Sequence, residues 1–149
     1  MKQIFPDYIR ELDYYLGSMS DDDLADFYIN EADCRTKLFD AMKRDFDRFG
    51  PLSKQRVLEA IEFILSSGQI DKLWGYVVPH AVPLDEVEDK SGYLRALYEK
   101  LAGREPQPRE FGLDVEVGDA IGPHGIDVRQ YEFKMQIQWG RIPSHRYPR

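Results

Sequence analysis

The chain has 149 residues and a formal net charge of −7 at pH 7, and 42% of its residues are hydrophobic and 13% aromatic. A chain of this length is near the common size of one domain, and its aromatic content excludes a disordered acidic chain although 32% of the residues are charged. The apolar stretches are far shorter than the roughly 20 residues of a membrane-spanning helix, so we expect no transmembrane role and no membrane partner.

The negative charge is concentrated in the first third of the chain. Residues 1–50 carry 12 acidic and 7 basic side chains, residues 51–100 carry 8 and 6, and residues 101–149 carry 7 and 7. An acidic surface repels the phosphates of nucleic acids and attracts basic proteins in a salt-dependent way. We therefore expect a basic protein partner and no nucleic acid.

Cysteine usage and the N-terminal composition indicate the compartment. The only cysteine is Cys34, which cannot form an internal disulfide. Charged residues are spread through the first 17 positions, where a secretory signal would be apolar. We therefore expect a cytoplasmic protein.

Helical patterns fill the first fifty residues. A proline in the first turn and a glycine stop delimit a short amphipathic helix over residues 6–16. Ser20 is a predicted N-cap, and the three aspartates that follow it complement the positive end of the helix dipole. Apolar residues then recur at three- and four-residue steps up to Gly50. This predicts one helix, or two collinear helices broken near Asn30.

Helical patterns continue to about residue 103. Ser53 is a predicted N-cap for a strongly apolar helix that ends at residues 66–68. A shorter helix is predicted over residues 70–77, and two prolines after it favour a non-helical connection. The next helix is predicted within residues 85–101, with Gly103 as its stop.

The periodicity changes from 3.6 to 2 in the last third of the chain. Apolar and polar residues alternate over residues 111–117 and again over residues 131–139, with a glycine-rich connection between them. This predicts a two-stranded antiparallel hairpin packed on the helices. The predicted fold is α+β with about five helices in a single domain (1–149): a mainly helical part (1–103), a connector (104–110), a β-hairpin (111–139) and a tail (140–149).

No motif in the chain predicts a metal site, a cofactor or catalysis. The acidic stretch lacks the alternating ligands of a calcium loop, and one cysteine with three scattered histidines gives no zinc pattern. Cys34 lies on the apolar stripe, where packing is the expected role, and His124 lies in a predicted turn without an acidic partner at a fixed spacing. We expect no cofactor, no bound metal and no enzymatic activity.

The acidic stretch is the one candidate interaction site. Asp22, Asp26 and Asp33 recur at helical spacing and fall on one side of the predicted helix, with Asp23 beside them. Tyr28 adds a large aromatic ring of the kind that anchors interfaces. The same pattern also suits helix capping and a solvated helix face. The predicted partner-binding residues are Asp22, Asp23, Asp26, Tyr28 and Asp33.

Three functions agree with these features. The first is a non-catalytic acidic binding protein that engages and inhibits a basic protein, such as a bacterial toxin immunity protein or antitoxin. The second is a structural or adaptor subunit that self-assembles through the open edges of the hairpin. The third is a small magnesium-dependent enzyme that uses carboxylates such as Asp22 and Asp26. The sequence leaves the oligomeric state open.

Overall fold

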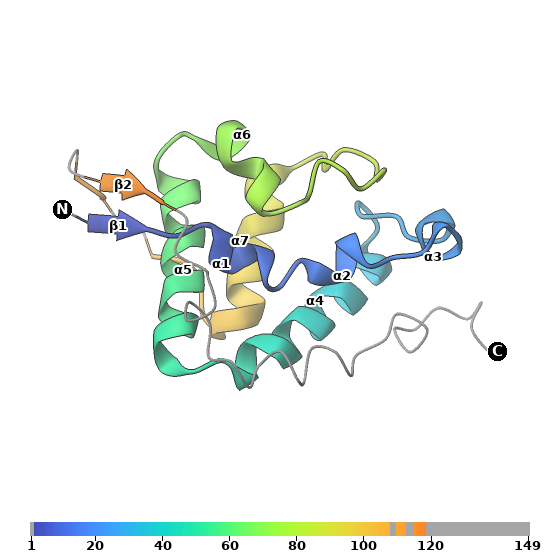
Figure 1. The fold of residues 1–149 in the computed structure, drawn as a ribbon, viewed down its shortest axis with the longest axis horizontal. Coiled ribbons are helices and arrows are strands. Elements are labelled where there is room, and N and C mark those ends of the chain that lie inside the picture. Colours follow the sequence, from blue (N-terminus) through green and yellow to red (C-terminus); the bar gives the residue numbers. More distant parts are fainter. Residues whose placement is uncertain (1, 108–109, 113–114, 119–149) are drawn as a thin grey trace.

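The computed structural model describes residues 2–107, 110–112 and 115–118 of the chain (Figure 1). Within these residues the protein is mostly helical, with seven α-helices, one short 3₁₀-helix and two short strands. In chain order the elements are β1 (Lys2–Ile4), α1 (Asp7–Arg10), α2 (Tyr14–Gly17), α3 (Asp21–Ala25), α4 (Ala32–Arg48), α5 (Pro51–Ser66), α6 (Ile70–Leu73), the 3₁₀-helix η1 (Trp74–Tyr76), α7 (Lys90–Ala102) and β2 (Val115–Val117).

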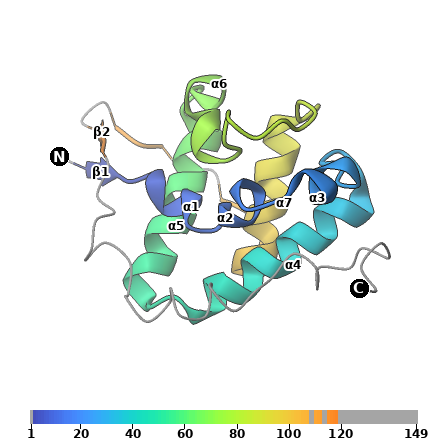
Figure 2. The same cartoon turned by 45° about the vertical axis from the view of Figure 1, so that its right-hand side comes forward.

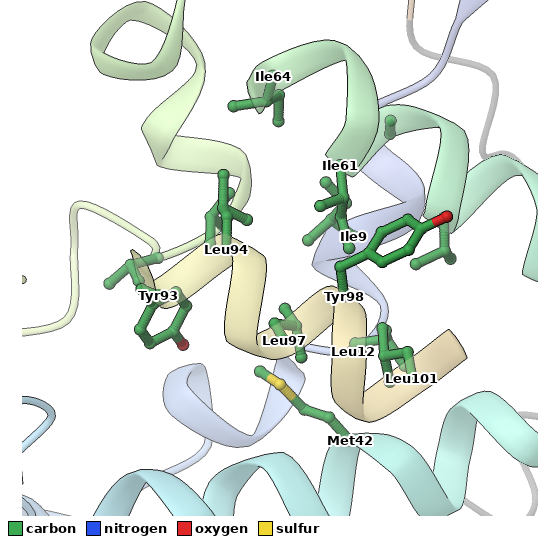
Figure 3. Close-up of a cluster of buried hydrophobic side chains, with 14 of the residues drawn as sticks. Ile9, Leu12, Met42, Ile61, Ile64, Tyr93, Leu94, Leu97, Tyr98 and Leu101 are labelled. Carbon is green, nitrogen blue, oxygen red and sulfur yellow. The ribbon is translucent and has the colours of Figure 1, made fainter. Parts of the chain in front are cut away.

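The core forms around α7, which packs against both α4 and α5. Figure 3 shows the buried side chains of α7 meeting Met42 from α4 and Ile61 from α5. These buried positions recur at three- and four-residue steps, as the sequence predicts, and each buried large apolar side chain contributes roughly 1.5–3 kcal/mol. The buried residues of α7 are Tyr93, Leu94, Leu97, Tyr98 and Leu101.

Local signals mark the end of α7 and the start of α5. Gly103 ends α7 in the left-handed conformation, with φ 73°, as predicted. The predicted cap at Ser53 is wrong, because α5 begins earlier: Gly50 is its N-cap and Pro51 occupies its first turn. Proline suits that position because its fixed φ is already helical and its missing N–H would have no helical partner.

The two predicted N-terminal helices are shorter than expected. The segment over residues 6–16 forms two one-turn helices, α1 and α2, because its side chains are buried on several sides rather than along one stripe. The longer predicted helix is divided into α3 and α4 by a non-helical segment, residues 26–31. The predicted break near Asn30 is therefore confirmed, but the two helices are not one continuous surface.

The short sheet contradicts the predicted fold class. β1 and β2 pair in parallel, with Lys2 opposite Val115 and Ile4 opposite Val117, whereas the sequence predicts an antiparallel hairpin over residues 111–139. A parallel pair needs a long crossover connection, and here the helical body between the two strands supplies it. The prediction is wrong because the three residues of β1 are too few to show alternation. The second predicted strand, residues 131–139, lies outside the described residues, as does the tail.

The sheet and α3 lie at opposite ends of the molecule, and both views agree on this (Figures 1 and 2). β1 contacts α5 at one end, while α3 and the first turn of α4 form the other. Within the described residues, every helix is too short or too polar to cross a membrane.

Candidate partner-binding surface

The acidic stretch starts α3 with a complete capping box. The Ser20 hydroxyl accepts a hydrogen bond from the Asp23 backbone N–H at 3.2 Å, and the Asp23 carboxylate accepts one from the Ser20 N–H at 3.2 Å. The predicted N-cap is confirmed. One oxygen of Asp23 therefore serves the helix, whereas the neighbouring Asp22 is exposed to solvent.

The predicted helical face of aspartates does not form, but its members remain close in the fold. Asp26 is the C-cap of α3, and Asp33 lies in the first turn of α4. The Cys34 thiol donates a weak hydrogen bond, 3.8 Å long, to the Asp26 carbonyl oxygen. This contact holds the end of α3 against the start of α4, so a turn rather than helical spacing keeps the two aspartates near each other.

The connection between α3 and α4 presents Tyr28 while it buries its neighbour. The side chain of Ile29 is fully buried, and the Arg35 guanidinium donates a hydrogen bond from Nε to the Ile29 carbonyl oxygen at 3.0 Å. Tyr28 is 47% exposed, an unusually open position for a large aromatic residue in this protein. The predicted anchor residue is therefore accessible from solvent.

Asn30 joins this region to a second acidic segment. Its Nδ2 donates to the Glu86 carbonyl oxygen at 2.9 Å, and its Oδ1 accepts from the Glu88 backbone N–H at 3.0 Å. Segment 85–89, with the sequence DEVED, is thereby fastened beside segment 26–31. We define the acidic end as the exposed carboxylates of these parts of the fold, apart from Asp89, which caps α7: Asp21, Asp22, Asp26, Glu31, Asp33, Asp85, Glu86 and Glu88.

The acids of segment 85–89 are functional candidates that the sequence reasoning missed. Four of its five residues are acidic and no Lys or Arg lies between Lys72 and Lys90, so composition alone would have marked it. Its position beside α3 depends on Asn30, a contact that bridges 56 positions in the chain. No local pattern predicts that contact.

Arg35 and Lys90, two cations close to the acidic end, already have partners, and one partner of Lys90, Glu86, belongs to that end. The Arg35 guanidinium lies 4.9 Å from the centre of the Tyr93 ring and is turned toward the core. Lys90 pairs with Asp71 at 2.9 Å and with Glu86 at 3.6 Å. No Lys or Arg occurs between positions 10 and 35. Among the described residues of this end, acidic side chains therefore outnumber basic ones.

Several acidic residues elsewhere in the fold form ion pairs, whereas most acids of the acidic end do not within the described part of the chain. Further along α4, Asp40 pairs with Lys100, and Asp47 pairs with Lys43 at 2.9 Å. Within the described part of the chain, the structure gives no ion pair to Asp22, Asp33, Asp85 or Glu88. Unpaired carboxylates on one surface favour association with a positively charged surface.

Comparisons with protein-family models, with curated proteins and with solved structures gave no match to this chain. Among the described residues, no three histidine, cysteine or acidic side chains are grouped closely enough to hold a metal ion.

Proposed function

We propose that this protein is a non-catalytic acidic binding protein that engages a basic protein through its acidic end and inhibits it by occlusion. A bacterial toxin immunity protein or antitoxin acts in this way when it covers a basic cleft. The observation that carries the proposal is the double hydrogen bond of Asn30, which fastens two acidic segments into one surface.

The chemistry of the surface suits a basic cleft. Carboxylates such as Asp22 and Asp33, which have no ion pair among the residues that the structure describes, steer a cationic partner and pair with its lysines or arginines. Tyr28 offers a large contact area at a low cost in side-chain entropy. A cytoplasmic location belongs to the same proposal, supported by the single Cys34.

The test is retention of a partner by the tagged protein from a lysate of its source cells, at low and high salt. We expect one basic protein to be retained at low salt and weakened at high salt, since the Debye length falls from about 10 Å at 0.1 M to about 3 Å at 1 M. Inhibition is then measured as loss of the partner's own activity when the acidic protein is added.

A charge-matched pair of variants makes this test specific to the acidic end. The first combines Asp22→Asn, Asp33→Asn and Glu88→Gln, and the control combines Glu99→Gln, Glu105→Gln and Glu110→Gln, which are exposed acids outside the acidic end. Each variant replaces three carboxylates by neutral amides, so the net charge of the protein changes equally in both. We expect the first to weaken partner binding about tenfold and the control to change it little. Equal effects of the two variants, or recovery of the protein alone, would contradict the proposal.

A further inference from the structure

A cavity of about 230 Å³ borders the acidic end. It lies between α6, η1, the connection that follows them and the first turn of α7. Drug-sized ligands and cofactors occupy roughly 300–1,000 Å³, whereas a water molecule takes about 30 Å³. The cavity therefore has room for one long side chain.

The walls of this cavity already hold one cation. The Lys90 ammonium group lies 2.9 Å from Asp71 Oδ1, 3.6 Å from Glu86 Oε1 and 5.6 Å from the centre of the Trp74 ring. The hydrogen bond that Lys90 donates to Asp71 raises the pKa of Lys90, against the opposing effect of burial. The charges of Asp71 and Glu86 raise this pKa further, so the ammonium form is favoured here. Carboxylates together with an aromatic ring are the surroundings that stabilise positive charge.

The lining keeps an excess of negative charge after Lys90 is counted. Asp71, Asp85 and Glu86 give three carboxylates against one ammonium, with histidine counted as neutral. Asp85 is exposed and has no ion pair within the part of the chain that the structure describes. A second cation is therefore favoured in this cavity, and an anion is disfavoured.

The residues that line the cavity favour arginine among the basic side chains. Val78 and Leu84 give the cavity an apolar wall for the methylene stem, and Asp85 and Glu86 follow each other in the chain at the same cavity. A guanidinium is planar and weakly hydrated, and it donates in a fork that matches carboxylates. We propose that this cavity receives one arginine side chain of the basic partner, an inference that rests on the proposed function.

The test uses a small probe, so that it does not depend on finding the partner. The amide derivative of N-acetyl-arginine is titrated into the full chain while the indole N–H signal of Trp74 is followed by NMR, with Trp139→Phe used to assign the two tryptophan signals. The matched probe is the citrulline derivative, which has nearly the same shape without the charge. We expect a saturable shift of the Trp74 signal for the arginine derivative, with a dissociation constant of about 1–10 mM. We expect no shift for the citrulline derivative.

One variant and one control locate the binding. Asp85→Asn is expected to weaken arginine binding about fivefold, whereas Glu99→Gln, an exposed acid further along α7, is expected to leave it unchanged. Equal shifts with arginine and citrulline, an unchanged affinity in Asp85→Asn, or no saturable shift at all would each overturn the inference.

The two proposals fail in different ways. If the arginine probe fails while a basic protein is retained in a salt-dependent manner, the cavity proposal is overturned and the proposed function stands. If the probe binds and no basic protein is retained, the proposed function is overturned and selectivity of the cavity for a guanidinium is supported.

Discussion

The helical core and the acidic end of this protein differ in how much apolar burial holds them. In the core, α7 buries five large side chains against α4 and α5. At the acidic end, α3 has no buried residue, and polar contacts add to the burial of Val87 and Ile29: the capping box, the Arg35 hydrogen bond to Ile29 and the two hydrogen bonds of Asn30. Ile29 is the fully buried anchor of the α3–α4 connection.

Because of this difference, the stability of the fold depends mainly on the core rather than on the acidic end. Burial of apolar side chains dominates the free energy of folding, whereas exposed carboxylates contribute little to it. The acidic end can therefore carry exposed negative charge at a small cost to the fold, such as that of Asp22 and Asp33, which have no ion pair in the described part of the chain. Substitutions in the two regions should differ both in size and in the property that they change.

The largest effect is expected for a cavity in the core. Leu97→Ala removes a fully buried side chain of α7 and should lower the free energy of unfolding by about 2–5 kcal/mol. Leu52→Ala is the matched control, because Leu52 lies on α5 with 55% of its surface exposed, and its change should stay within about 0.5 kcal/mol. Urea unfolding of both variants measures the difference. Similar losses would show that α7 is not the centre of the core.

The second effect concerns pH and Tyr93. Burial, with the charge of Asp13 nearby, raises the pKa of Tyr93 well above its ordinary value of 10.0. The unfolded chain then loses this proton above about pH 10 while the folded protein keeps it, so stability is fully present below that pH and falls as pH rises. The expected loss for this one group is about 1.4 kcal/mol per pH unit, until the folded pKa is reached.

Tyr93→Phe tests this directly. The Tyr93 hydroxyl is buried without a hydrogen-bond partner among the described residues, so its removal should raise the free energy of unfolding by about 1 kcal/mol at pH 7. The variant should also lose stability less steeply above about pH 10. Urea unfolding at a series of pH values gives both quantities. Parallel curves for the two proteins would contradict the assignment to Tyr93.

The third prediction concerns the hydrogen bonds between the two acidic segments. Asn30→Ala removes both hydrogen bonds to segment 85–89 and should cost about 1 kcal/mol. Hydrogen exchange of the Glu88 amide is the sharper readout, because that N–H donates to Asn30 and should exchange faster in the variant. Asn30→Asp keeps the acceptor for Glu88 and should retain part of the protection. Unchanged exchange in Asn30→Ala would show that segment 85–89 is held by other contacts.

The smallest effect on stability is expected for the acidic end itself. Asp22→Asn should change the free energy of unfolding by less than about 0.5 kcal/mol, because Asp22 is exposed and has no ion pair within the described residues. It should nevertheless weaken binding of a basic partner at low salt and leave binding at high salt almost unchanged. Binding measured at both salt concentrations tests this. A large loss of stability would mean that Asp22 supports the fold.

Part of the candidate surface could be read from the sequence and part could not. Asp22, Asp33 and Tyr28 are exposed, as a binding role requires, although that role itself stays a prediction. Asp23 belongs to the same predicted set, and in the structure its carboxylate also caps α3. The sequence predicts a helix within residues 85–101 and so does not mark segment 85–89 as a binding surface, whereas α7 begins only at Lys90.

The sequence by itself determined the features that depend on neighbouring residues. The cap at Ser20, the stop at Gly103 and the apolar stripe of α7 follow from backbone hydrogen bonds and from periodicity within a few positions. Only the tertiary structure decided the parallel pairing of β1 with β2 and the joining of Asn30 to segment 85–89. These contacts connect positions far apart in the chain, so they depend on a fold that offsets the entropy of closing long loops, and no pattern of neighbouring residues encodes them.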